Sequence, residues 1–124
     1  MPETDERLSR AGLLRRRSEY QNCYRRGRRR HGRFVTLHIT ANQVGHTRLG
    51  ITATRKVGGS VVRHLLKRRV REIYRRWPER LRLPAVDLVV HLKPAAGGTD
   101  FSSLQEDLLR LLSGGLVRGQ KASH

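Results

Sequence analysis

The residues best suited to chemistry in this sequence are cations spaced four apart within residues 61–77. They recur at every fourth position: Arg63, Lys67, Arg71 and Arg75. In an α-helix this spacing places them on one face, rising about 6 Å per step. A planar guanidinium can hold a phosphate with two hydrogen bonds. The spacing therefore predicts a track for a polyanion and not a site that reads bases.

The charge of the whole chain supports that reading. The 124 residues are enough for one domain, and 27 Lys and Arg against 10 Asp and Glu give a formal net charge of +17. Two blocks, 7–33 and 55–76, carry nearly all of the excess. Self-repulsion at this charge opposes the compact state, so we expect a neutralising partner. Nucleic acid fits better than a membrane surface, which needs bulky apolar anchors beside the cations.

Several classes of site are excluded or disfavoured by residue type. The single Cys23 allows no internal disulfide and no multi-cysteine zinc site, and the six histidines lack close ligand spacing. Metal-assisted phosphodiester cleavage needs clustered carboxylates, and the basic blocks offer only Glu19 and Glu72. We therefore expect no catalytic or metal site in the chain itself and no small-molecule substrate. The first residues lack the apolar stretch of a signal peptide, which favours a cytoplasmic protein.

The spacing of apolar residues predicts a mixed α/β (α+β) two-layer domain over residues 9–112. A disordered leader is expected at 1–8, a loop at the arginine cluster 28–30, and a flexible tail at 113–124. Ser60 is expected to cap the longest helix, and Pro78 to end it. The elements follow the order α-β-β-α-β-α: a helix at 18–26, strands at 34–41 and 48–54, a helix at 61–77, a strand at 86–91 and a helix at 101–112.

The helix at 61–77 separates an apolar stripe from a cationic stripe. On a helical wheel the cations span about 140° of arc, and the apolar residues fall together on another side. The apolar stripe consists of Val62, Leu66, Val70, Ile73 and Trp77. We expect this stripe to fix the helix to the sheet and to hold the cations outward. Glu72 is placed to pair with Arg68 or Arg76.

Residues 48–72 resemble the signature of the protein component of bacterial ribonuclease P. They read RLGITATRKVGGSVVRHLLKRRVRE, where that family has a strand RLGISVSKKVG running into a helix AVVRNRIKRRLRE. The resemblance extends over about residues 8–112 and departs from the family pattern at two places. The family's Arg-Asn-Arg triplet is here Arg63, His64 and Leu65, which removes one cation, and the aromatic residue that is usually Phe is Tyr20.

The resemblance implies a fold like the second domain of ribosomal protein S5, with a left-handed crossover around the basic helix. It implies the protein subunit of an endoribonuclease whose RNA subunit performs the chemistry. That reaction removes the 5′ leader of precursor tRNA and gives the mature 5′ end. The partners would be ribonuclease P RNA and precursor tRNA, with magnesium bound mainly by the RNA subunit and the substrate.

The resemblance also assigns site residues. Those facing RNA would be Arg55, Lys56, Arg63, His64, Lys67, Arg68, Arg71 and Arg75. A cleft for the single-stranded leader would be lined by Tyr20, Tyr24 and Phe34, although each of these aromatics could equally be a core residue. Two other functions remain open: a ribosomal or assembly protein of the same fold and basicity, and a ribonuclease that acts without RNA.

Overall fold

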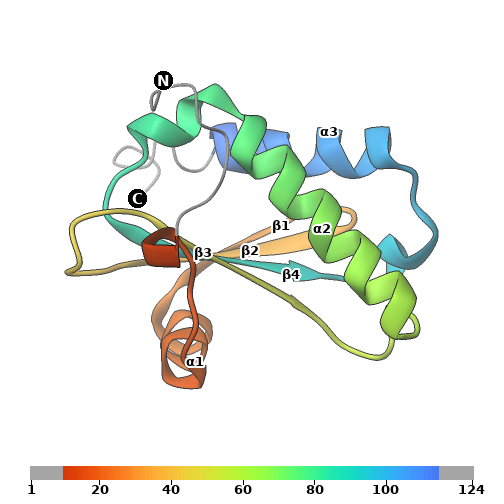
Figure 1. The fold of residues 1–124 in the computed structure, drawn as a ribbon, viewed down its shortest axis with the longest axis horizontal. Helices are drawn as coiled ribbons and strands as arrows, with labels where there is room; N and C mark the ends of the chain where they lie inside the picture. Colours follow the sequence, from red (N-terminus) through yellow and green to blue (C-terminus); the bar gives the residue numbers. More distant parts are fainter. Residues whose placement is uncertain (1–9, 115–124) are drawn as a thin grey trace.

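A four-stranded sheet carries helices on both faces in the computed structural model, which describes residues 10–114 (Figure 1). The expected leader at 1–8 and most of the expected tail at 113–124 lie outside the described residues. Short 3₁₀ turns occupy Arg10–Gly12, Pro78–Arg82 and Pro94–Gly98. The helices are α1 (Arg17–Arg26), α2 (Ser60–Arg76) and α3 (Phe101–Leu112), and the strands are β1 (Arg28–His31), β2 (Val35–Ala41), β3 (Arg48–Ala53) and β4 (Val86–Leu92).

The loop expected at residues 28–30 is wrong, because these arginines form the edge strand β1. β1 pairs antiparallel with β2, with Arg29 opposite His38. The buried carboxylate of Asp107 on α3 holds the turn that connects β1 to β2. It accepts hydrogen bonds from the backbone N–H groups of Arg33 and Phe34 at 2.9 and 2.8 Å. The strand forms because its backbone pairs with β2 and because this distant carboxylate holds the turn. Its residues do not alternate between apolar and polar, so the sequence did not indicate a strand. The order of elements is therefore α-β-β-β-α-β-α.

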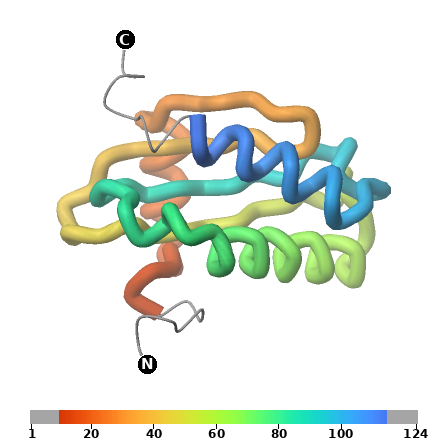
Figure 2. Tube along the Cα trace, turned by 90° about the horizontal axis from the view of Figure 1, so that it is seen from above, coloured from red at the N-terminus to blue at the C-terminus, as the bar shows by residue number. Residues whose placement is uncertain are grey.

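The topology confirms the crossover that the resemblance implied. The strand order is β1-β2-β4-β3, and β3 is parallel to β4. The chain leaves β3, returns along α2 on the near side of the sheet and enters β4 as the inner neighbour (Figure 2). This connection is left-handed, whereas parallel crossovers are right-handed in nearly all proteins. It places α2 near the edge strand β3.

The two faces of the sheet have different covers. Leu37, Ile51 and Val90 lie in the main core, which α2 and α3 complete to form the two-layer sandwich. The opposite face carries α1 (Figure 1), whose Cys23 is fully buried in a smaller cluster with Val89. The Cys23 thiol donates to the backbone oxygen of His38 at 3.4 Å, so α1 is anchored at its middle. Burial raises the pKa of this thiol to about 11.

The segment before α1 covers part of the edge strand β3. Leu13 forms an isolated parallel bridge to Leu49, and the N–H of Leu14 donates to the Leu49 carbonyl at 2.8 Å. Leu14 is itself buried. The chain therefore supplies its own partner for the start of β3.

Helix α2 packs as the helical wheel predicts. Leu66, Val70 and Ile73 are buried in the main core, and the helix ends before Pro78. The expected cap by Ser60 is wrong, because the helix begins at Ser60 itself and Gly59 stands at the N-cap without a side-chain bond. No helix within the described residues is both long and apolar enough to cross a membrane.

Candidate nucleic-acid interface

Five residues on the outer side of α2 form what we call the basic face: Arg63, His64, Lys67, Arg68 and Arg71. His64, Arg68 and Arg71 are exposed, and Arg63 and Lys67 are half-buried. None of the five forms an ion pair with a described residue, although Arg63 donates from Nε to the Gly58 carbonyl at 3.2 Å. The apolar stripe below holds these side chains in register, so the helix presents several uncompensated charges toward solvent.

Arg75 differs from the other members of the predicted ladder. Glu72 reaches both Arg75 and Arg76, each at 2.9 Å, so the expected pairing with Arg76 is confirmed and the alternative with Arg68 is not formed. The carboxylate compensates part of the charge at this end of the helix. Arg55 and Lys56 are exposed in the turn that precedes α2.

A pocket of about 230 Å³ at the edge strand β3 brings together residues from both sides of the sheet. Tyr20 of α1 lines it together with Lys67 and Arg71 of α2. The Tyr20 ring lies against Gly50, where a Cβ atom would come 2.5 Å from the ring, so a larger residue there would displace the ring. One predicted cleft residue therefore shares a pocket with two predicted RNA-facing residues.

Tyr24 lies on the sheet with two histidines, and we call Tyr24, His38 and His91 the aromatic cluster. The Tyr24 ring meets His38 and His91 edge to face, with centroids 4.6 and 6.2 Å apart. Its hydroxyl lies 2.6 Å from Thr52 Oγ1, which lies 2.9 Å from Nδ1 of His91. The sequence showed no ligand spacing among the histidines and gave His38 and His91 no role. The strand alternation that places His38 opposite the core side was the available signal.

The aromatic cluster is uncharged at neutral pH. Burial, with smaller contributions from His91, Arg29 and His31, lowers the pKa of His38 to about 4, and burial lowers the pKa of His91. His38 is only 6% exposed, and its Nδ1 has no hydrogen-bond partner in the described part of the chain. The cluster therefore offers aromatic edges and polar atoms, but no cation.

We expect His38 to make stability depend on pH. Between its pKa of about 4 in the folded state and the ordinary 6.5, the unfolded chain binds a proton that the folded chain does not. Stability is then lost as the pH falls from about 6.5 toward 4, by at most about 3 kcal/mol. Urea unfolding of wild type and His38→Phe across this range measures the difference. Parallel pH profiles for the two proteins would contradict the assignment.

Phe34 does not join the two tyrosines. It packs in the main core with α3, and the Arg33 guanidinium lies 5.0 Å from its ring centroid. Strand alternation continued back from β2 would put Phe34 on the same face as His38, but the turn at 32–34 interrupts it, because the N–H of Gly32 bonds to the Val35 carbonyl at 2.8 Å. The structure thus places Phe34 in the main core, the alternative that the sequence left open for it, and apart from the two tyrosines.

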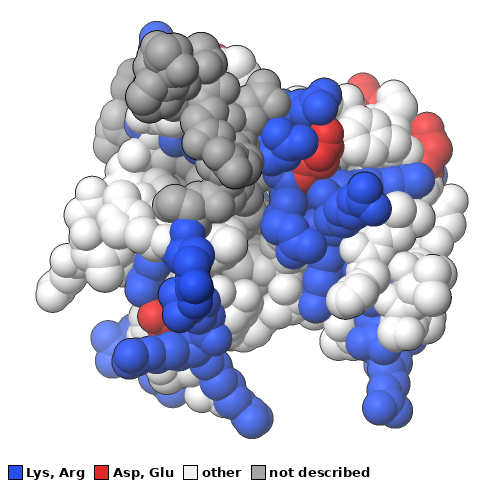
Figure 3. All heavy atoms as spheres, in the orientation of Figure 1, with Lys and Arg blue, Asp and Glu red and all other residues white. Residues whose placement is uncertain are grey.

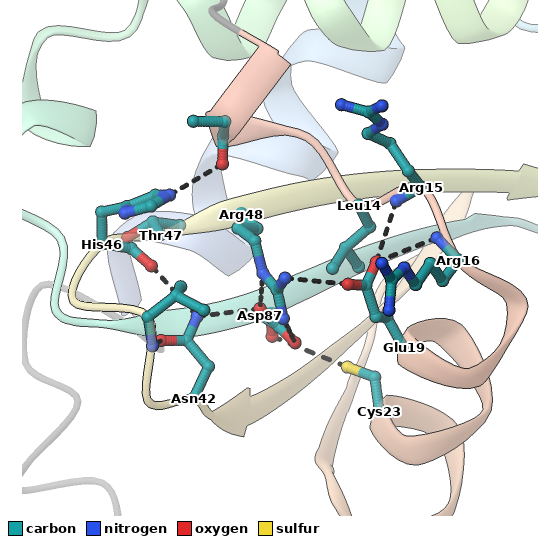
Figure 4. A network of polar contacts seen from close by, with 12 residues as sticks. Leu14, Arg15, Arg16, Glu19, Cys23, Asn42, His46, Thr47, Arg48 and Asp87 are labelled. Atoms are coloured by element: carbon teal, nitrogen blue, oxygen red, sulfur yellow. Dashed lines mark hydrogen bonds and ion pairs between the residues drawn. The ribbon is translucent and has the colours of Figure 1, made fainter.

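A polar network positions α1 on the sheet (Figure 4). Arg48 of β3 binds both carboxylate oxygens of Asp87 at 2.9 Å and donates to Glu19 of α1 at the same distance. Asn42 donates to Asp87 at 2.8 Å. Burial alone would raise the pKa of Glu19, but hydrogen bonds from the two backbone N–H groups before α1 and from Arg48 outweigh it and lower that pKa. Sequence reasoning missed this network, whose members are far apart along the chain.

Cations gather over several parts of the face of the molecule drawn in Figure 3, including the end of the turn that precedes α2. Figure 3 shows Lys and Arg over α1 and over α2, with uncharged surface between them. The arginines of β1 belong to the opposite edge of the sheet, so only part of the first basic block lies beside α2.

No group of three or more His, Cys, Asp or Glu side chains within residues 10–114 is placed to hold a metal ion. The carboxylates nearest the basic surfaces, Glu19 and Glu72, are each bound to arginines. The described donor set therefore does not fit a protein-held magnesium ion.

Comparisons with known proteins place this geometry in a family. The family model described as Ribonuclease P matches residues 8–114. A relative from Clostridium botulinum, named ribonuclease P protein component, is 31% identical over 99 residues, covering 80% of this chain and 89% of its own. One of the same name from Thermus thermophilus is 41% identical over 95 residues, covering 76% and 55%. The solved RNase P protein from Thermotoga maritima superposes with a TM-score of 0.71 at 30% identity, covering 81% and 94%.

Proposed function

Because the chain belongs to the family of ribonuclease P protein components, we propose that it binds the RNA subunit of that enzyme and the 5′ leader of precursor tRNA. The chain is then part of an endoribonuclease complex. It assists removal of the leader, which leaves the mature 5′ end of the tRNA, and it acts in the cytoplasm.

The basic face of α2 carries the proposal. Lys67, Arg68 and Arg71 form no ion pair with a described residue, and the buried stripe of the same helix fixes their positions. A partner with regularly spaced phosphates gains from such an arrangement, because the helix backbone that carries the cations need not be ordered upon binding. We propose RNA as that partner, with Arg55, Lys56, Arg63 and His64 completing the surface.

The aromatic residues of α1 support a place for the leader. Single-stranded RNA is held by stacking of its bases on aromatic side chains, largely without regard to sequence. Tyr24 is 37% exposed beside two neutral histidines, and Tyr20 lines the β3-edge pocket with Lys67 and Arg71. We propose that bases of the leader contact Tyr24 and the aromatic cluster while its phosphates approach the cations of α2.

We propose that the RNA subunit performs the hydrolysis, with magnesium bound mainly by that RNA and the substrate. The chain contributes cations that offset repulsion between two polyanions. No pair of described carboxylates near the basic surfaces is free of arginine partners. This favours a binding subunit over a ribonuclease that acts alone.

Reconstitution tests the function. The purified chain is expected not to cleave precursor tRNA by itself, and to restore accurate 5′ cleavage by a bacterial ribonuclease P RNA at low magnesium. Cleavage by the protein alone would favour a protein-only ribonuclease. No stimulation of the RNA would favour a ribosomal or assembly protein.

Crosslinking tests the place of the leader. A photoreactive benzoylphenylalanine at Tyr24 is expected to crosslink to a labelled leader within the complex. The same group at Phe101 is the matched control, because Phe101 is also 37% exposed but lies on α3, across the sheet from α1. Equal crosslinking from both positions would overturn the assignment of the leader to the α1 side.

A further inference from the structure

Two aliphatic side chains stand in solvent at the start of α2, beside the basic face. Val61 is 81% exposed and Leu65, one turn later, is 44% exposed. The core is completed by other residues of the same helix, so neither side chain is needed there. Exposed aliphatics one turn apart on an otherwise cationic surface form a small apolar patch whose shielding from water would be favourable.

These side chains line an open depression of about 600 Å³. Ser60, His64, Arg68 and Arg71 complete the lining. The depression thus combines two aliphatic side chains with two arginines. Arg68 and Arg71 form no ion pair with a described residue, so their charges remain available to an anionic ligand.

We propose that Val61 and Leu65 form a seat for an unstacked nucleobase of the partner RNA, with Arg68 and Arg71 holding phosphates of the adjacent nucleotides. This inference rests on the proposed function and adds a contact of a different kind to it. A nucleotide combines a flat, weakly hydrated base with a charged phosphate, which matches an apolar centre beside cations. Unpaired RNA loops and bulges supply such splayed bases.

A second copy of the chain fits the depression less well. The net charge is +17, and the arginines beside the apolar patch would face those of a two-fold related molecule. Like charges brought together at an interface disfavour association. Two aliphatic side chains also offer far less apolar area than a stable protein interface requires.

A base seat would give Leu65 a role in RNA binding that its lack of charge does not suggest. Considered by charge alone, leucine at this position is only a missing cation, and Leu65→Arg should strengthen RNA binding. If Leu65 covers a base, Leu65→Arg removes apolar contact while adding a charge. The two effects separate in a plot of log affinity against log salt concentration, because phosphate contacts set the slope and the remaining interactions set the affinity extrapolated to 1 M salt.

The test measures binding of the full chain to a transcribed bacterial ribonuclease P RNA over a range of salt concentrations. We expect Val61→Ser and Leu65→Ser each to lower the extrapolated affinity about fivefold without changing the slope. Leu65→Arg is expected to lower the extrapolated affinity similarly while steepening the slope by about 0.7 to 0.9. The matched control is Leu81→Ser in the 3₁₀ turn after α2, a leucine that is 70% exposed, which should change neither quantity.

Chemical probing identifies the occupant. Dimethyl sulfate and a carbodiimide together report on all four bases. We expect at least one unpaired base to be protected by wild type and to regain reactivity with the double variant Val61→Ser/Leu65→Ser. Circular dichroism of that variant should match wild type, since both side chains are outside the core.

Several results would overturn the seat while leaving the proposed function intact. These are unchanged extrapolated affinity in the serine variants, the same protections with the double variant, or losses as large in Leu81→Ser. A concentration-dependent dimer of wild type that the double variant abolishes would assign the patch to a second copy. Failure of wild type to stimulate the RNA would instead reject the proposed function.

Discussion

Replacing Lys67, Arg68 and Arg71 together by glutamine is expected to weaken binding to ribonuclease P RNA about 100-fold at 0.15 M salt. Each lost phosphate contact lowers the slope of log affinity against log salt by about 0.7 for single-stranded and 0.9 for duplex RNA, so the triple variant should lose about 2 to 3 in slope. The same arithmetic gives the loss of affinity. Filter binding over a series of salt concentrations measures both quantities.

A matched comparison separates this effect from a change in overall charge. Arg71→Gln should lower the slope by nearly one, whereas Arg82→Gln, an exposed arginine in the 3₁₀ turn after α2, should leave it nearly unchanged. Helix content of the triple variant should be preserved, because glutamine is a good helix former and the buried stripe is untouched. A triple variant that retains the wild-type slope would contradict the basic face as the RNA contact.

Arg48→Met is expected to destabilise the fold by about 3 kcal/mol, because it leaves the Asp87 carboxylate buried without its cation. Asp87 is almost fully buried, and Asn42 would remain as its side-chain donor. The reverse change, Asp87→Asn, should cost less, since the Arg48 side chain is 18% exposed and keeps Glu19. Urea unfolding at neutral pH measures both variants.

The control for Arg48→Met is Arg15→Met, whose exposed guanidinium forms no ion pair with a described residue, and a change below about 0.5 kcal/mol is expected. The double variant Arg48→Met/Asp87→Asn should recover part of the loss, because the buried position is then neutral. A double variant whose loss equals the sum of the single losses would show that the two residues do not act as a pair.

Sequence reasoning succeeded where one element contains its own pattern. Helix α2 has apolar and cationic residues at helical spacing, and Pro78 supplies a stop, so its core side and its outer side followed from the sequence. The motif at 48–72 then gave the family, and with it the left-handed crossover. The type of residue was a poorer guide to the start of α2, where Ser60 was expected at the N-cap and Gly59 occupies it.

It failed where a distant partner decides the structure. Arginines 28–30 have no strand pattern, and they become β1 because β2 and Asp107 organise the turn beside them. Strand alternation would put Phe34 on the same face as His38, but that turn rotates its side chain into the core. His38 and His91 carry no mutual spacing in the chain, and only the pairing of β2 with β4 brings them under Tyr24.

The segment before α1, in which Leu13 and Leu14 bond to β3, has a consequence for the protein before it binds RNA. The edge strands of an open sheet have unpaired backbone groups that can bond to strands of other molecules, which is a common start of fibrillar aggregation. Here the chain's own backbone occupies the start of one margin, and Arg28–His31 puts cations along the other. Both features oppose the pairing of sheet edges between copies of the chain, and this protection does not depend on a bound polyanion.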